Sequence, residues 1–342
     1  MAVPMLSDST RSVTGGVDTH KHVHVAAVVN WIGAELGTAS FATTTVGYEE
    51  LLDWMRNHGE VARVGVEGPG SWGVEVVEIN RPNRQDRRRT GKSDAIDATA
   101  AARAALAGLD AGIPKAGDGP IESIRMVRLA RRSAVTTRTR TMNQIRAVID
   151  TASDDVRDRY RHLTPMALIK AITGTRPGPN IGDPAVAAVS TLRILGRRWR
   201  FMNDQTAELD TQLETLVRST APNLLAIHCV GVETAATLLV TAGDNPGRLT
   251  SEAAFAAVCG VNPRPAGSGK TNGRHRLNRA GDRNANNALW RIVMARMSHD
   301  ERTRTYVQRR TTEGLSKREI IRCLKRYVAR EIYPILIGDL TS

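Results

Sequence analysis

Aromatic residues are scarce in this chain of 342 residues, where Phe, Trp and Tyr together make up 4%. Proteins that bind single-stranded nucleic acid mainly through rows of stacked bases need more aromatic side chains than this, so that class is disfavoured. Cysteine is scarce too, because the chain has only Cys229, Cys259 and Cys323 and no C-x-x-C pair. An odd, widely spaced set argues against a disulfide framework and against a zinc site. It is typical of buried thiols in a reducing cytoplasm.

Long apolar runs are also missing. Met1 to Arg11 contains no apolar signal-peptide core, and no stretch is long and apolar enough to span a bilayer. A complete phosphate-binding loop is missing as well, because Arg264 occupies the first glycine position of the G-x-x-x-x-G-K-[ST] pattern that would end at Thr271. The sequence therefore predicts a cytoplasmic protein that contacts no membrane and has no P-loop.

Positive charge is abundant. The chain has 48 Lys and Arg against 35 Asp and Glu, a formal net charge of +13, and a pI of about 10.3. This balance indicates a polyanionic partner that is contacted mainly through its phosphates. We expect that binding weakens steeply with added salt, because Arg–phosphate contacts release counterions.

The first part of the chain has the pattern of an α/β domain. Strands are predicted at 13–17, 23–29, 41–45, 61–66 and 74–79, and helices at 48–58 and 94–106. Only Gly68 to Gly73 separate Glu67 from the last of these strands. A parallel crossover usually needs about a dozen residues or more. We therefore expect this strand to pair in another way, or the domain to lack a layer.

Helical patterns dominate the rest of the chain. A linker-like stretch at 112–120 precedes an Arg-rich helical pattern at 121–152. Further on, six residues step by three and four, namely Trp199, Met202, Thr206, Leu209, Leu213 and Leu216. This seam suits a helical hairpin or a dimer contact about as well as ordinary bundle packing. The predicted division is a disordered N-terminus (1–12), an α/β domain (13–120), a helical region (121–220) and a mainly helical C-terminal domain (221–342).

Four acidic residues stand where a metal-dependent nuclease would need them. Asp18 and Glu67 end predicted strands, whereas Asp94 and Asp97 lie three residues apart on one helix face. Two-metal phosphodiester chemistry needs several carboxylates that converge on ions about 4 Å apart. Each acid alone could equally be a helix cap or an ordinary surface residue.

Three histidines follow the first of these acids at alternate positions, His20, His22 and His24. A zinc site is one interpretation of this spacing. A polar turn with a strand edge is the favoured one, because no cysteine or further ligand completes a zinc site.

Ser268 stands between Gly267 and Gly269 in a basic stretch. A serine flanked by glycines lets another backbone approach closely. The surrounding basic residues could neutralise a scissile phosphate and its neighbours; they are Arg264, Lys270, Arg274, His275, Arg276, Arg279 and Arg283. The serine could attack a phosphodiester or merely hydrogen-bond a phosphate, and the residues alone favour the second role.

The turn at Cys229 to Ala236 resembles a helix-hairpin-helix motif, which offers backbone N–H groups to a phosphate. The usual second glycine of that motif is Glu233 here. A purely structural helix–turn is at least as good an interpretation.

In their order and spacing, several motifs resemble the DEDD-type insertion-sequence transposases, a family that also includes the Piv/MooV DNA invertases. The matching stretches are GVDTHK at 16–21, VEG at 66–68, GKSDAIDA at 91–98, SGKT at 268–271, NRAGD at 278–282 and IIRCLKRYVARE at 320–331. The last of these is similar to the family's actinobacterial members. The resemblance covers nearly the whole chain.

The resemblance implies an N-terminal RuvC-like (RNase H-like) domain, a coiled-coil middle and a C-terminal transposase domain. It implies that Asp18, Glu67, Asp94 and Asp97 bind Mg²⁺, and that Ser268 forms a phosphoserine link to DNA. The implied partners are double-stranded donor and target DNA, a structured bridge RNA, and further copies of the chain, with homodimers that pair into a tetramer. The residues expected to contact nucleic acid are Arg81, Arg84, Arg87, Arg88, Arg89, Lys92, Arg128, Arg131, Arg132, Arg138, Lys270, Arg274, Arg276, Arg279 and Arg283.

Three functions follow from these observations. The first is an RNA-guided recombinase in which Ser268 attacks the phosphodiester. The second is a RuvC-like, structure-specific nuclease that uses water as the nucleophile and Ser268 only for binding. The third is a non-catalytic nucleic-acid-binding protein.

Overall fold

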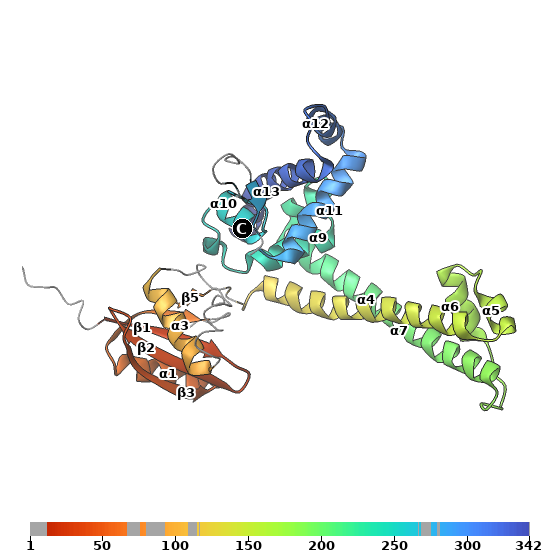
Figure 1. Cartoon of the computed structure of the whole chain (residues 1–342), viewed down its shortest axis with the longest axis horizontal. Coiled ribbons are helices and arrows are strands. Elements are labelled where there is room, and N and C mark those ends of the chain that lie inside the picture. The colour runs from red at the N-terminus through yellow and green to blue at the C-terminus, as the bar shows by residue number, and fades with distance from the viewer. Residues whose placement is uncertain are drawn as a thin grey trace, which may run out of the picture. The chain divides into compact units, whose positions relative to one another are not determined.

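The computed structural model describes residues 12–66, 76–79, 93–108, 115, 117–265, 267, 275–278 and 281–341. The chain divides into two compact units, shown in Figure 1. The sheet unit comprises Met1–Gly119 with Ala242–Ala254, and the helical unit comprises Pro120–Thr241 with Phe255–Ser342. A mixed α/β N-terminal part followed by a mostly helical remainder is confirmed. The finer four-part division stays a prediction.

The sheet unit is built on a five-stranded sheet with the order β3-β2-β1-β4-β5. Its strands are β1 (Ser12–Thr19), β2 (Val23–Asn30), β3 (Glu35–Ala42), β4 (Glu60–Val66) and β5 (Val76–Glu78). β2 pairs antiparallel with β1 and with β3, whereas β4 pairs parallel with β1 and with β5. The predictions at 13–17, 23–29 and 61–66 are confirmed.

Two strand predictions need correction. The third strand lies at Glu35–Ala42 and not at 41–45, because Thr44 caps the next helix by accepting a hydrogen bond from Gly47 N at 3.1 Å. The expectation that the last strand pairs in another way is wrong, since β5 is parallel to β4 in the register Val64↔Val76. β5 starts at Val76, so the connection spans 67–75. That connection lies outside the described residues, so the alternative that the domain lacks a layer stays a prediction.

Two helices cover the opposite faces of this sheet, as Figure 1 shows. α1 (Thr45–Arg56) buries Leu51 and Met55 against the valines of β1 and β4, and α3 (Asp94–Leu106) lies on the other face. The range predicted for α3 is confirmed, and α1 lies close to its predicted range of 48–58. Successive residues of a strand point to opposite faces. Gly15 accordingly faces Met55 of α1, whereas Gly16 faces Ala98 and Ala102 of α3.

The helical unit starts with two long antiparallel helices, α4 (Pro120–Thr151) and α7 (Pro184–Thr220). The direction follows from the contacts, since Arg131 of α4 pairs with Asp210 whereas Arg138, one heptad later, reaches back to Asn203. Every seventh residue of the predicted seam, Trp199, Thr206 and Leu213, is buried. Among the three alternatives for the seam, the structure shows a helical hairpin within one chain. The coiled coil implied by the family resemblance stays a prediction.

Two short helices, α5 (Asp154–Tyr160) and α6 (Pro165–Gly174), connect the long pair at its far end. Tyr160 and Ile172 join Ile145 and Leu192 in a shared core. The hairpin thus has its own hydrophobic core at this end.

The remaining elements are α8 (Pro222–Ala226), α9 (Val232–Ala242), the 3₁₀ turn η1 (Pro246–Arg248), α10 (Glu252–Val258), β6 (Pro263–Pro265), β7 (His275–Leu277), α11 (Arg283–His299), α12 (Glu301–Thr312) and α13 (Lys317–Thr341). The sequence predicted two helical stretches after Ser268, and the structure has three. Asp300 makes the difference, because its carboxylate accepts hydrogen bonds from Thr303 N and Oγ1 at 2.8 and 2.5 Å and so starts a new helix.

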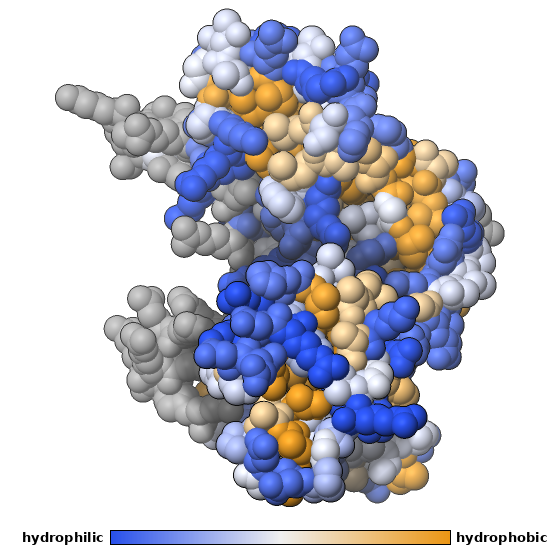
Figure 2. Space-filling view, turned by 90° about the vertical axis from the view of Figure 1, so that its right-hand side faces the viewer, coloured by the Kyte–Doolittle hydropathy of each residue, from blue (hydrophilic) through white to orange (hydrophobic). Residues whose placement is uncertain are grey.

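The surface of the described residues is mixed. None of their helices combines the length and the apolar character that crossing a bilayer requires. Figure 2 shows one face, on which hydrophilic residues predominate and several apolar patches reach the surface. The prediction of buried thiols is confirmed for Cys259 and wrong for Cys229 and Cys323, which are only partly buried; all three are free.

Candidate functional site

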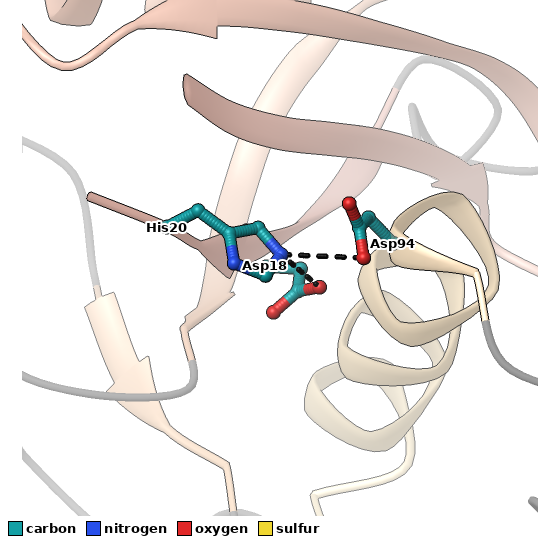
Figure 3. A group of neighbouring side chains, drawn as sticks. All are labelled: Asp18, His20 and Asp94. Atoms are coloured by element: carbon teal, nitrogen blue, oxygen red, sulfur yellow. Dashed lines mark hydrogen bonds and ion pairs between the residues drawn. The ribbon is translucent and has the colours of Figure 1, made fainter. Parts of the chain in front are cut away.

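Asp18, His20 and Asp94 form a compact group where the carboxyl end of β1 meets the start of α3 (Figure 3). The Nε2 atom of His20 lies 3.2 Å from Oδ2 of Asp18 and 3.3 Å from Oδ1 of Asp94. One ligand atom from each residue lies within 4.8 Å of the other two. The side chain of Asp18 is 12% exposed and that of Asp94 is 49% exposed, so the group opens to solvent on the helix side. Two carboxylates and one imidazole are a donor set that can hold a divalent cation.

The close approach of α3 to the sheet brings Asp94 to Asp18. Gly16 of β1 pairs directly with Gly65 of β4, so two residues without side chains lie next to each other under the helix. A Cβ on Gly16 would lie 2.2 Å from the carbonyl oxygen of Ala98, and one on Gly65 would lie 2.6 Å from that of Ala101. No other residue type leaves room for a helix backbone here.

The N-terminus of α3 fixes where Asp94 stands. Ser93 is the N-cap residue, with an extended backbone and a side chain that accepts a hydrogen bond from Ile96 N at 3.3 Å. Asp94 is therefore the first helical residue rather than the cap, and a carboxylate there is stabilised by the helix dipole. Further along, Thr99 donates a 2.7 Å hydrogen bond to Glu35, and Arg103 donates a 2.9 Å bond to the Gly33 carbonyl. These contacts fasten the helix to the β2–β3 hairpin.

His20 is missing from the set of site residues predicted from the sequence. It lies just after β1, and its backbone N donates a 3.3 Å hydrogen bond to Nδ1 of His24. The ring of His24 is buried and stacks on Tyr48 with centroids 5.5 Å apart. Burial, together with the nearby His20, lowers the pKa of His24, while Asp18 opposes the shift. A neutral His24 accepts at Nδ1, so it orients the segment that carries His20. The available signal was the two-residue spacing from Asp18 at a strand end.

The other two predicted metal ligands, Asp97 and Glu67, are not part of this group of three residues. Asp97 is one turn further along α3 and only 7% exposed, and its carboxylate is not among the three grouped ligand atoms. Glu67 lies outside the described residues. It directly follows Val66, which pairs with Val17, the residue before Asp18. The roles of Asp97 and Glu67 as metal ligands stay predictions.

A two-stranded ribbon, β6 with β7, brackets the serine segment of the helical unit. Pro263 pairs with Leu277, Arg264 with Arg276, and Pro265 with His275. Ser268 lies outside the described residues. Two exposed arginines thus stand directly opposite each other at the base of the segment. Like charges in directly opposed positions destabilise a strand pair, and an anion near them would remove that cost.

The base of this ribbon is held rigidly. Gly281 packs on Gly260 so closely that a Cβ on it would lie 2.2 Å from the Gly260 nitrogen. Asn286 Nδ2 donates to the Gly260 carbonyl at 2.9 Å, and the buried Lys325 donates to Asn286 Oδ1 at 2.7 Å. Burial lowers the pKa of Lys325. The two ends of the ribbon are therefore anchored to α11 and α13.

Two of the arginines predicted on α4, Arg128 and Arg131, form ion pairs within the chain. Arg128 binds Glu233 at 2.9 Å, and Arg131 contacts both Glu233, at 3.4 Å, and Asp210. These pairs tie α4 to α9 and α7. Glu233 stands where a helix-hairpin-helix motif has its second glycine, so this turn has at least a structural role. Binding of nucleic acid by Arg128 and Arg131 stays a prediction.

Four of the remaining residues predicted to contact nucleic acid are described. Arg138 donates a hydrogen bond to Asn203 at 2.9 Å and lies over the Trp199 ring, 5.9 Å from its centroid. Arg132, Arg276 and Arg283 are exposed. The others lie outside the described residues; they are Arg81, Arg84, Arg87, Arg88, Arg89, Lys92, Lys270, Arg274 and Arg279.

Comparison with known proteins adds to this geometry. Residues 15–153 match a transposase model, that of the DEDD transposases of IS110 elements. Residues 221–308 match the family described as "Transposase IS116/IS110/IS902 family". The chain is also similar to the "Insertion element IS110 uncharacterized 43.6 kDa protein" of Streptomyces coelicolor, with 29% identity over 137 residues, 40% of this chain. The similar region spans 34% of that relative's length.

Proposed function

We propose that this chain, which carries two IS110-type transposase domains, is a metal-dependent transposase that cuts and rejoins DNA strands. The grouping of Asp18, His20 and Asp94 inside the first matched domain carries the proposal. Asp94 is distant in the sequence from Asp18 and His20, and the packing of α3 on β1 brings its N-terminus to them. A site of this kind suits phosphodiester chemistry better than a structural role.

The donor set fits a hard divalent cation. Carboxylate oxygens are the ligands that Mg²⁺ prefers, and Mn²⁺ accepts carboxylates and imidazole alike. Neighbouring ligand atoms around such an ion stand about 3–4 Å apart, close to the separations found here. Asp18 and Asp94 would hold the ion, His20 would add a nitrogen, and Glu67 and Asp97 would complete the site. A bound Mg²⁺ supplies charge stabilisation for the phosphorane-like transition state.

Ser268 is the proposed nucleophile. Its hydroxyl oxygen loses its proton and attacks phosphorus, so that a serine–phosphate bond forms as the bond to the leaving strand oxygen breaks, and the leaving oxygen takes up one proton in exchange. The covalent link keeps the bond energy for rejoining. The opposed Arg264 and Arg276 at the ribbon base support this role, because they favour a phosphate beside the segment. The proposal requires Ser268 to reach the acidic group within one chain or across two.

A nuclease that uses water as its nucleophile is the second candidate. The family model that matches residues 15–153 points to a RuvC-like, nuclease-type site. Asp18 and Asp94, two of the acids proposed for that site, lie close together, whereas Ser268 lies outside the described residues. In this alternative Ser268 only binds a phosphate, and cleavage leaves no protein on the DNA.

Adduct trapping separates the two candidates. The substrate is a labelled plasmid that carries the DNA flanking this gene, incubated with Mg²⁺ and then denatured. We expect a protein–DNA adduct with the wild type and with Thr271→Val, and none with Ser268→Ala. Removal of a nucleophile typically lowers turnover by about 10³-fold or more. Cleavage by Ser268→Ala without any adduct would establish the water mechanism instead.

The acids need a separate experiment. Asp94→Asn combined with Asp97→Asn should abolish cleavage and leave DNA binding largely intact. Asp53→Asn on α1 is the matched control, because it removes an exposed carboxylate, 72% accessible, that only pairs with Arg56. Equal cleavage by the double variant and the control would refute the proposed site.

The proposed partners are donor and target DNA duplexes, a structured bridge RNA and further copies of the chain, as a dimer that pairs into a tetramer. The net charge of +13 supports the nucleic-acid partners. Co-purification of an RNA of defined size would favour RNA guidance, and its absence would favour a DNA-only enzyme. Action in the cytoplasm stays a prediction.

A further inference from the structure

A cavity lies in the helical unit between α11, α12 and α13, and none of the residues of the acidic group or the serine segment line it. Its volume is about 670 Å³. Pockets that bind small ligands occupy about 300–1,000 Å³, so the space admits a ligand of nucleotide size. Its walls combine aromatic rings with guanidinium groups.

The aromatic part is a pair of tyrosines. Tyr306 of α12 and Tyr327 of α13 meet edge to face, with centroids 5.7 Å apart and an interplanar angle of 88°. Tyr327 is 50% exposed, although its neighbours Leu324 and Val328 on α13 are buried. The whole chain has only five tyrosines, and two of them line this one cavity. A half-exposed ring held by a second ring is a ready stacking surface.

The charged part is positive. Four arginines line the cavity, namely Arg296, Arg302, Arg309 and Arg330, against the two acids Asp300 and Glu331. Glu331 accepts two hydrogen bonds from Arg296, at 2.7 and 2.8 Å, and Asp300 caps α12. Both carboxylates are therefore engaged within the protein, and the four arginines against two acids leave a net charge of +2 among the lining residues. Arg309 also pairs with Glu313, outside the lining, at 3.6 Å, so Arg302 and Arg330 carry most of the positive charge that faces the cavity.

The aromatic and the charged parts of the cavity wall are in contact. The Arg309 guanidinium lies over the Tyr306 ring, 5.4 Å from its centroid. Burial, with Cys323 and Tyr327 nearby, raises the pKa of Tyr306 to about 12. The phenol is thus neutral at physiological pH and does not repel an anion. An aromatic face beside a positive rim suits a flat ring that carries a phosphate.

We propose that this cavity binds one unpaired nucleotide of a DNA or RNA strand, with its base stacked on Tyr327 and its phosphate beside Arg302 and Arg330. In a duplex the base faces are covered by neighbouring bases, so only an unpaired nucleotide offers one. A purely electrostatic phosphate site has no use for the tyrosines. The low aromatic content of the chain disfavours binding by rows of stacked bases, but a single stacking position needs only one exposed ring. The inference goes beyond the proposed strand cleavage and requires only that the protein meets nucleic acid.

Binding of short oligonucleotides to the full chain tests the proposal without cleavage. The probes are DNA and RNA hexamers with one 2-aminopurine, and a longer blunt-ended DNA duplex that stays paired, all without divalent metal. Tyr327→Ala should weaken hexamer binding by about 5- to 150-fold, the range measured when one stacking aromatic is removed. It should also abolish the quenching of 2-aminopurine. Tyr327→Phe keeps the ring and should retain both signals, and duplex affinity should change little.

Matched controls separate stacking from general charge. Arg302→Gln should weaken hexamer binding more than Arg304→Gln, which removes an exposed charge from the same helix outside the cavity. Trp31→Ala removes an exposed ring from the sheet unit, 59% accessible, and should have no effect. An equal loss of hexamer and duplex binding in Tyr327→Ala would overturn the proposal, as would unchanged hexamer binding.

A measurement on the wild type covers the case in which a variant fails to fold. Hexamers with 5-iodouracil crosslink on irradiation to aromatic side chains that stack on the base. We expect the crosslinked peptide to contain Tyr327, and a crosslink confined to other peptides would refute the site. The DNA and RNA arms show which strand is preferred. Adduct trapping at Ser268 is independent of all these signals, so the failure of one proposal is distinguishable from the failure of the other.

Discussion

Replacing Gly16 by alanine should separate Asp18 from Asp94 without touching either of them. The new Cβ would lie 2.2 Å from the Ala98 carbonyl oxygen and 2.3 Å from the Ala102 nitrogen, both of which are helix backbone. Ordinary contact begins near 3.4 Å, so α3 must move away by about 1.2 Å, the difference between 3.4 and 2.2 Å. Asp94 sits at the start of this helix and would move with it.

Two opposing effects set the magnitude of the change in stability. Overpacking of a well-packed contact costs about 1–3 kcal/mol. Replacing glycine by alanine also restricts the unfolded chain, which stabilises the fold by about 0.4–1 kcal/mol where the backbone permits. The clash is with backbone and cannot be relieved by rotating a side chain, so the first effect is the larger one. We expect a net loss of about 1–2 kcal/mol.

Local and functional assays together test this reasoning. Hydrogen exchange of peptides from β1 and α3 should show lower protection in Gly16→Ala, and Mn²⁺ affinity should fall. Misplacement of a catalytic group by about 1 Å can lower a reaction rate about 100-fold, so the rate of DNA cleavage should fall further than the affinity for Mn²⁺. Gly37→Ala in β3 is the control, because its Cβ would meet only side-chain atoms, the nearest being His58 Nε2 at 3.2 Å. If both variants exchange and bind Mn²⁺ alike, α3 does not contact the sheet at this glycine.

Three further predictions concern single side chains. His20→Ala should lower Mn²⁺ affinity about 10-fold or more, the loss seen when a ligand or its support is removed; equal affinity in His20→Ala and in the exposed control His22→Ala would rule out a ligand role. Cys229 has φ +66°, a conformation that costs a non-glycine residue about 1–2 kcal/mol, so Cys229→Gly should raise the urea midpoint relative to Cys229→Ala; identical midpoints would contradict this. Burial lowers the pKa of His24 in the folded chain below the 6.5 of the unfolded chain. Between the folded and the unfolded pKa, the unfolded chain binds a proton that the folded chain lacks, so the free energy of unfolding should fall as the pH drops through 6.5. An unchanged dependence of stability on pH in His24→Asn would show that another group is responsible.

Much of the sheet unit was predictable because its patterns are local. An Ala-rich run after Ser93 specifies α3, and three apolar runs specify β1, β2 and β4. The placement of Asp18 at a strand end and of Asp94 at a helix start was enough to expect that they meet.

The features that were not predicted depend on tertiary contacts. β3 is an edge strand whose residues are largely exposed, so it has no strong apolar alternation, and only pairing with β2 defines its range. β5 has three residues, and only its pairing with β4 defines its direction. His20 joins the acids because β1 runs to Thr19, which puts the histidine beside the helix N-terminus.

The number of positive charges in a segment does not tell which arginines are available to bind a phosphate. Arg128 and Arg131 have the helical spacing of a phosphate-binding face, yet carboxylates of α7 and α9 already occupy both guanidinium groups. Arg264 and Arg276 stand in a weak, Pro-containing pattern, yet the ribbon places them opposite each other, which costs energy unless an anion lies near. Displacing Glu233 from α4 would break partly buried ion pairs before a phosphate could bind, whereas a phosphate at the ribbon relieves a repulsion. The release of counterions on DNA binding should therefore come more from the ribbon than from α4, although α4 carries more positive charge in the sequence.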